Sequence, residues 1–205
     1  MWMKLNKLTI NYKKTKYMLF TNRKDTKNRQ VFIGTNKIEQ VSEIKYLGVI
    51  IDDKLSWKCH IQFVCSKLCS GSWALLKLRN FVDLSTLKSV YYSIIYCHLQ
   101  YCITSWGLAS VSALNPLEKI HKRIIRIITK SPFKAHTISL FHKLKFLKIN
   151  EICNLEIAKY MYCLQSDQKA FQYHNLKSTK LIDNYNTRNT SSSNFYLIRK
   201  KTRNR

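Results

Sequence analysis

The spacing of apolar residues changes abruptly near Ser56, and this change constrains the fold more than any other feature of the chain. Before it, residues 8–51 contain short β-branched or aromatic runs separated by polar, turn-forming stretches. After it, apolar residues recur at spacings of three and four, as they do on one face of a helix. We therefore predict an α+β fold, in which three or four antiparallel strands with a hairpin around Gly34 precede a helical bundle.

The helical part is expected to contain five helices. Their expected ranges are 56–81, 83–107, 113–129, 136–144 and 150–164. Ser56 is expected to cap the first helix, and Pro116 to lie in the first turn of the third, where a missing N–H is tolerated. The chain then divides into a β segment (1–55), a helical bundle (56–165) and a polar, basic, flexible tail (166–205).

The charge balance points to a polyanionic partner. The chain has 36 Lys and Arg against 11 Asp and Glu, a formal net charge of +25. Nucleic acid is the first candidate partner and an anionic membrane surface the second. We expect no transmembrane segment, because the most apolar stretch, 87–109, is interrupted by Lys88, His98 and Gln100.

The seven cysteines are odd in number and lie within apolar stretches. This pattern favours reduced core thiols over a disulfide framework. We therefore expect an intracellular protein, in the nucleus or the cytoplasm. Zinc sites at Cys59-His60 or Cys97-His98 are disfavoured because neither has the paired ligand spacing of a structural site.

The third expected helix carries one basic face. At 100° per residue its basic side chains fall within an arc of about 100°, opposite an isoleucine-rich side. The basic residues are Lys119, Lys122, Arg123, Arg126 and Lys130. The opposite side consists of Leu117, Ile120, Ile124, Ile127 and Ile128. This arrangement predicts contact with phosphates, the alternative being a solvated surface face.

Asp52 and Asp53 form the one adjacent pair of acids. They precede the expected start of a helix, where acids interact favourably with the helix dipole. We therefore interpret them as helix-start acids and not as ligands of catalytic metals. The tryptophans Trp57, Trp73 and Trp106 lie at helical spacing with apolar residues, and we expect them in the core and not as base-stacking platforms.

Several ordered motifs resemble a known family. LTINYKKTKYMLF at 8–20 resembles the segment that closes the palm of non-LTR retrotransposon reverse transcriptases of the jockey type. IEQVSEIKYLGVIIDDKLSWKCHI at 38–61 is similar to the following primer-grip region. The similarity continues through LKSVYYSIIYCHLQYCITSWG and LEKIHKRIIRIIT. The chain thus resembles the palm edge and thumb or connection region of an RNA-directed DNA polymerase, truncated at both ends.

The resemblance assigns roles to particular residues. Lys14 matches the motif lysine that acts as a general acid, here vestigial, with Asn11 and Thr15 supporting its loop. The primer-grip segment is matched by Tyr46, Leu47, Gly48 and Val49. Cys97 replaces a proline of many members, which predicts a straighter helix.

The resemblance also implies an absence of catalysis by this chain alone. The family's F/Y-x-D-D motif, which binds Mg²⁺ in the full-length enzyme, would lie before Met1. We therefore expect no cofactor here, an RNA or DNA primer–template as partner, and the remainder of the polymerase as a second partner. The alternatives are a self-standing basic helical nucleic-acid-binding protein without enzymatic role, and a protein bound to a membrane surface through the basic helix.

Overall fold

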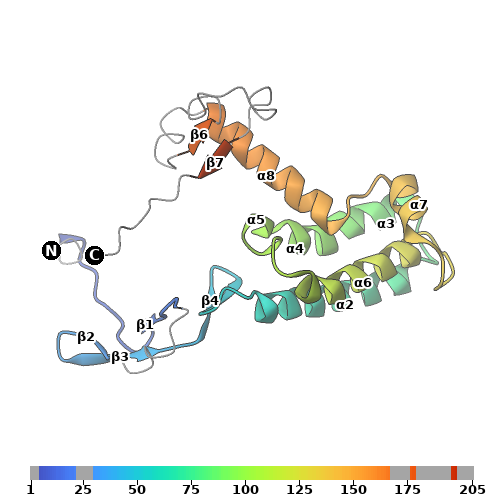
Figure 1. Ribbon diagram of the computed structural model, residues 1–205. Coiled ribbons are helices and arrows are strands. Elements are labelled where there is room, and N and C mark those ends of the chain that lie inside the picture. The colour runs from blue at the N-terminus through green and yellow to red at the C-terminus, as the bar shows by residue number, and fades with distance from the viewer. Residues whose placement is uncertain (1–4, 22–29, 167–175, 179–194, 198–205) are drawn as a thin grey trace. The chain divides into compact units, whose positions relative to one another are not determined.

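The computed structural model describes residues 5–21, 30–166, 176–178 and 195–197 (Figure 1). The chain forms two compact units, 1–153 and 154–205. Small sheets near the N-terminus are followed by helices, so the expected α+β class is confirmed. Most of the expected flexible tail lies outside the described residues. Within the second unit, β6 (Leu176–Ser178) pairs antiparallel with β7 (Phe195–Leu197).

The first sheet contains β1 (Lys16–Tyr17), β2 (Val31–Ile33) and β3 (Asn36–Gln40). β2 and β3 form the expected hairpin, with Ile33 paired to Asn36 and Gly34 in the left-handed region at φ 63°. β1 instead pairs parallel with β3, so the all-antiparallel expectation is wrong here. Because β2 runs antiparallel to β3, β3 has the same direction as β1, and it lies between the other two strands in the sheet.

A second hairpin joins β4 (Glu43–Tyr46) to β5 (Val49–Asp52), and β5 leads into α2 (Lys58–Leu78). The prediction that Ser56 caps this helix is wrong. The residue before the helix is Trp57, in a left-handed conformation at φ 63°, and it makes no side-chain cap. The backbone N–H groups before the helix are bound by Asp52, as described below.

The second expected helix is not continuous. It divides into α3 (Leu84–Tyr91), a π-helical turn η2 (Tyr92–Tyr96), α4 (Cys97–Gln100) and α5 (Ile103–Trp106). Asp83 caps its start by accepting hydrogen bonds from Ser85 and Thr86. The π turn precedes Cys97, whose thiol donates to the Ser93 carbonyl, and the straightening expected from Cys97 stays a prediction. The helix then breaks at Tyr101 and Cys102, the latter at φ 51°.

The remaining helices are α6 (Val111–Ile128), α7 (Thr137–Leu144) and α8 (Ile149–Ser166). The Ser110 side chain caps α6 by accepting from the Ala113 N–H. Because α6 begins two residues earlier than expected, Pro116 lies in its second turn and not in its first. None of the helices in the described ranges combines the length and apolar character needed to cross a bilayer.

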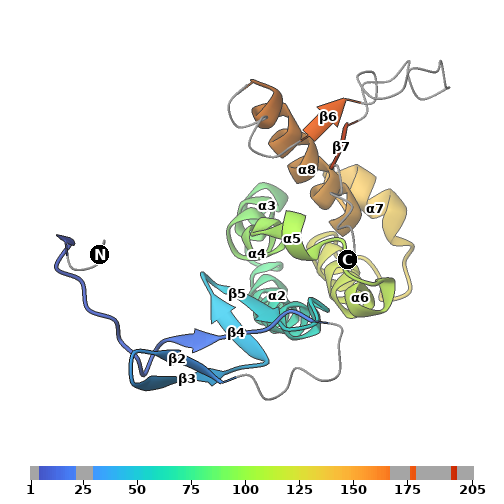
Figure 2. The same cartoon turned by 60° about the vertical axis from the view of Figure 1, so that its left-hand side comes forward.

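The core of the first unit is formed where α2 and α6 lie side by side, as both views show (Figures 1 and 2). Its fully buried side chains include Leu68, Leu75, Ile95, Trp106 and Ile124. Gly71 of α2 permits close packing against η2, because a Cβ there would lie 2.5 Å from Ile95 Cδ1. All seven cysteines are free, but only Cys153 is buried, so the core-thiol expectation is wrong for the exposed ones: Cys69, Cys97, Cys102 and Cys163.

Candidate nucleic-acid interface

α6 presents the basic face predicted from its sequence. Its buried residues follow the helical period and pack against α2 and α7. They are Leu114, Leu117, His121, Ile124, Ile125, Ile127 and Ile128. Lys119 and Arg123 lie one turn apart on the opposite, exposed side. The helix thus holds positive charge outward with a firmly packed apolar face behind it.

The five basic side chains differ in how far they are engaged. Lys122 pairs with Glu118 at 3.4 Å. Arg126 is half-buried and its Nε donates to the Ala135 carbonyl at 3.0 Å. Lys119 and Arg123 make no hydrogen bond or ion pair with any described residue.

Lys130 lies apart from the helical face. α6 ends at Ile128, and Lys130 follows in the left-handed region at φ 54°. It lines a separate cavity of about 250 Å³, together with Asp83 and Lys143. Helical periodicity therefore does not give the direction of its side chain, although the residue remains exposed.

His121 is the residue on α6 that sequence reasoning missed. It is buried among aromatic rings, stacked with Tyr91 and edge-on to Phe141, and shares a 2.9 Å hydrogen bond with the Tyr91 hydroxyl. Burial, together with repulsion from Lys122, lowers the pKa of His121 to about 4. Its position among Leu117, Ile124 and Ile128 in the helical period was the available signal, since it lies on their side of the wheel.

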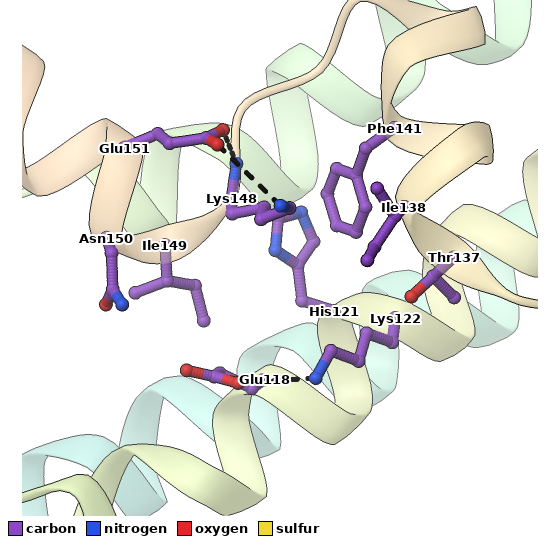
Figure 3. Close-up of a pocket in the computed structure, with 10 residues that line it drawn as sticks. All are labelled: Glu118, His121, Lys122, Thr137, Ile138, Phe141, Lys148, Ile149, Asn150 and Glu151. Atoms are coloured by element: carbon purple, nitrogen blue, oxygen red, sulfur yellow. Dashed lines mark hydrogen bonds and ion pairs between the residues drawn. The ribbon is translucent and has the colours of Figure 1, made fainter.

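A cavity of about 400 Å³ lies above His121, between α6, α7 and the first turn of α8 (Figure 3). Its charges are balanced in pairs, Lys122 with Glu118 and Lys148 with Glu151. Glu151 also accepts from the Lys148 backbone N–H at 2.8 Å, which fixes the start of α8. We call this the paired cavity.

The hairpin between β4 and β5 presents the segment that resembles a primer grip. Tyr46 pairs with Val49, so the loop contains only Leu47 and Gly48, at φ 46° and 84°. Two central residues with positive φ are typical of a type I′ turn, whose twist matches that of the strands. Tyr46 and Leu47 are exposed at the tip, whereas Val49 is buried.

Tyr101 attaches this hairpin to the helical bundle. Its hydroxyl donates to the Leu47 carbonyl at 2.6 Å, and its ring lies 3.5 Å from where a Cβ on Gly48 would be. The Trp106 indole N–H donates to the Tyr101 carbonyl at 2.9 Å. The helix break at Tyr101 therefore holds the hairpin tip in a defined position.

Lys14 lies on a turn formed by its neighbours. Its backbone N–H donates to Asn11, at 3.1 Å to the carbonyl and 3.2 Å to Oδ1. The Thr15 hydroxyl donates to the Asn11 carbonyl at 2.9 Å. The Lys14 side chain is exposed. Asn11 and Thr15 thus form the loop that presents this lysine.

Asp52 and Asp53 differ in their contacts. The two carboxylate oxygens of Asp52 accept from Ser56 N and Trp57 N at 2.8 and 2.9 Å. Desolvation alone would raise the pKa of Asp52, but these hydrogen bonds outweigh it and lower the pKa. Asp53 makes no such contact. No group of three His, Cys, Asp or Glu residues in the described ranges is arranged to hold a metal ion.

The three tryptophans differ in environment. Trp106 is fully buried, as expected, and Trp57 is partly buried. Trp73 is 61% exposed on α2 and lies under the Lys77 ammonium at 5.1 Å, so the core assignment is wrong for it. It falls on the side of α2 opposite Leu68 and Leu75, which explains its exposure.

Comparison with known proteins finds relatives among the RNA-directed DNA polymerases of mobile elements, including the following three. The chain is 25% identical over 162 residues to a "Probable RNA-directed DNA polymerase from transposon X-element" of Drosophila melanogaster, covering 78% of this chain and 18% of that protein. It is 29% identical over 133 residues to an "RNA-directed DNA polymerase from mobile element jockey" of Drosophila funebris, covering 63% and 14%. The jockey protein of Drosophila melanogaster is 28% identical over 164 residues, covering 78% and 18%.

The chain is similar in sequence to jockey-type RNA-directed DNA polymerases. This confirms the resemblance predicted from its motifs. The chain spans less than a fifth of the length of these jockey-type polymerases. No protein-family model matches it, and no solved structure does.

Proposed function

We propose that this chain supplies nucleic-acid-binding elements of a non-LTR retrotransposon RNA-directed DNA polymerase, with an RNA or DNA primer–template as its partner. The observation that carries the proposal is the exposed basic face of α6. Its Lys119 and Arg123 have no described partner and are held outward by a buried isoleucine-rich side. Phosphates are the groups that neutralise such a row of charges, with release of counterions.

The β4–β5 hairpin is the second element of the proposal. A type I′ turn exposes Tyr46 and Leu47 at its tip, and Tyr101 fixes that tip to the helical bundle. A rigid exposed tip can hold the end of a strand against the rest of the polymerase. Lys14 is proposed as a vestigial counterpart of the general acid, because its turn is formed by the motif residues Asn11 and Thr15.

We further propose that this chain does not catalyse extension by itself. Two-metal phosphoryl transfer needs carboxylates that converge on two cations. Several acids in the described part are engaged otherwise: Asp52 and Asp83 bind backbone N–H groups at helix starts, and four glutamates pair with lysines. Purified chain with primer–template, deoxynucleotides and Mg²⁺ or Mn²⁺ should extend no primer. Template-dependent extension above that of a mock preparation contradicts this.

The binding proposal is tested by the salt dependence of affinity. Log affinity for duplex DNA should fall linearly with log salt, by about 0.9 per phosphate contact. Lys119→Gln/Lys122→Gln should reduce that slope by between about 1 and 2, because the exposed Lys122–Glu118 pair is weak enough for a phosphate to compete with it.

The matched control is Lys16→Gln/Lys159→Gln. It removes the same net charge from lysines of β1 and α8 that pair with Glu39 and Glu156. Its slope should remain close to that of the unmodified chain. Equal slopes for the α6 variant and the unmodified chain, with unchanged circular dichroism, would show that this face is merely solvated. A loss of binding to anionic vesicles alone would favour the membrane alternative.

A further inference from the structure

A third cavity, of about 220 Å³, opens beside the last turns of α2 and α6. It is lined by Leu76, Arg79, Arg123, Arg126, Ile127, Ser131 and Phe133. Three of its side chains are arginines and none is acidic. We call it the arginine cavity. Arg79 comes from the end of α2, far from α6 in sequence, so no single-helix pattern could reveal the cluster.

The charges in this cavity are not compensated by the protein. Arg79 and Arg123 make no ion pair or side-chain hydrogen bond within the ranges that the structure describes. Cations near helix C-termini are favoured by the helix dipoles, which offset part of the repulsion. Two helix ends carry only about one half negative charge each, whereas three guanidinium groups carry three positive charges. The imbalance favours an anionic ligand.

Arg126 is held in place before any ligand arrives. Its Nε donates to the Ala135 carbonyl at 3.0 Å, and its guanidinium lies 5.9 Å from the Phe133 ring centroid. An arginine fixed through Nε keeps its terminal N–H groups for an anion. Planar guanidinium groups match the oxygens of a phosphate with two parallel hydrogen bonds.

Phe133 supplies a different chemistry at the same place. Its ring is 80% exposed, although it follows Pro132 in a segment whose other residues are polar or small. An exposed ring beside arginines offers a face on which a nucleic-acid base can stack. Bases inside a duplex are already stacked on their neighbours, so an exposed ring of this kind recognises unpaired bases.

We propose that the arginine cavity binds one unpaired nucleotide of RNA or DNA, with a backbone phosphate among Arg79, Arg123 and Arg126 and the base on Phe133. The inference rests on the proposed function and narrows it. α6 then carries two kinds of contact: Lys119 and Lys122 bind phosphates of any strand, and the arginine cavity selects single-stranded nucleic acid.

The decisive experiment compares Phe133→Ala with Phe81→Ala in the full chain. Phe81 is 86% exposed but does not line the cavity. The probes are a 12-nucleotide oligouridine and a blunt 12-base-pair duplex. Phe133→Ala should weaken binding of the oligouridine by about 5- to 140-fold, the range for one stacked base. Binding of the duplex should stay within about twofold, and Phe133→Trp should retain oligouridine affinity.

A second variant tests the phosphate contact. Arg79→Gln should reduce the salt slope for the oligouridine by about 0.7, the value for one phosphate of a single strand. The Lys16→Gln/Lys159→Gln control should not reduce it. Circular dichroism and thermal melting confirm that the variants remain folded.

The outcomes separate the two proposals. If Lys119→Gln/Lys122→Gln weakens binding of both probes but Phe133→Ala changes neither, the inference about the cavity is wrong and the proposed function stands. If the unmodified chain binds neither probe, both are wrong. If Phe133→Ala instead loses binding to phosphatidylserine vesicles and keeps the oligouridine, the cavity binds a membrane surface and the nucleotide assignment is wrong.

Discussion

The two cavities beside α6 differ in how their charges are balanced. Around the paired cavity, Glu118 faces Lys122 and Glu151 faces Lys148 (Figure 3). Around the arginine cavity three guanidinium groups gather without an acid. α6 therefore contributes to the paired cavity, where charges are neutralised within the protein, and to the arginine cavity, where they are not. An amphipathic pattern alone does not separate these two uses.

The difference in charge balance follows from the elements that line each cavity. The paired cavity is closed by the first turn of α8, where Glu151 serves both the Lys148 backbone and its side chain. The arginine cavity lies at helix C-termini, where an acid would be unfavourable with the dipoles. Glu151 is therefore placed at a helix start and the unpaired Arg79 at a helix end. Four predictions test this contrast, from the largest expected effect to the smallest.

The largest effect concerns His121, beside the paired cavity. Burial lowers the pKa of His121 to about 4 in the folded chain, against 6.5 for an ordinary histidine. The neutral form is favoured on folding, so its contribution to stability is complete above pH 6.5 and is lost as the pH falls toward 4. At pH 4 the loss should be about 3 kcal/mol.

Urea unfolding of the unmodified chain and of His121→Gln measures this contribution. Gln keeps a hydrogen-bonding group for Tyr91 but does not titrate. The pH dependence between 6.5 and 4 should be smaller in the variant by about that amount. His60, whose pKa is also lowered by burial, titrates in both chains and cancels from the difference. Identical pH profiles would contradict a buried neutral His121.

The next effect concerns Arg126, the one arginine of its cavity that is tied to the protein. Arg126→Gln should lower the free energy of unfolding by about 1 kcal/mol, because the hydrogen bond to the Ala135 carbonyl and the packing on Phe133 are lost. Chemical denaturation measures it. A neutral result would mean that Arg126 is no better anchored than Arg79.

A third variant removes an acid from the paired cavity, so that its charges resemble those of the arginine cavity. Glu118→Gln removes the acid that pairs with Lys122. The free energy of unfolding should fall by no more than about 0.5 kcal/mol, as for other i,i+4 pairs. Lys122 is then free to meet a phosphate, and the salt slope for duplex DNA should steepen by up to about 0.9. An unchanged slope would show that removing Glu118 adds no phosphate contact at Lys122.

The smallest effect is expected for the stability of Arg79→Gln. With no described partner to lose, the free energy of unfolding should change by less than about 0.5 kcal/mol, although binding of the oligouridine weakens. Thermal and urea unfolding measure it. A loss above about 1 kcal/mol would assign Arg79 a structural role and remove the contrast with Arg126.

The features of the fold and of the candidate site that could be predicted are those set by residues close together in the sequence. The basic and isoleucine-rich sides of α6 follow from helical period alone, and the hairpin around Gly34 follows from its turn residues. Helix-start acids were expected at Asp52 and Asp53, but only the structure shows that Asp52 makes the contacts. The choice between them depends on how the chain folds back before α2.

The features that escaped prediction depend on contacts between distant residues. The helix break at Tyr101 is fixed by Leu47, 54 positions away in the chain. Arg79 joins Arg123 and Arg126 only because α2 and α6 pack together. The helical period places His121 on the buried side of α6, but its partners there, Tyr91 and Phe141, come from other parts of the chain.

The turn at the tip of the β4–β5 hairpin lowers the stability of the hairpin. Type I′ turns favour Asn and Gly at their two central positions, because both residues tolerate positive φ. Here the first position holds Leu47, which is 73% exposed. A leucine in this conformation costs roughly 1 kcal/mol. The hairpin is therefore less stable than the same hairpin with Asn or Gly at this position. In exchange, it places an exposed apolar side chain at its tip.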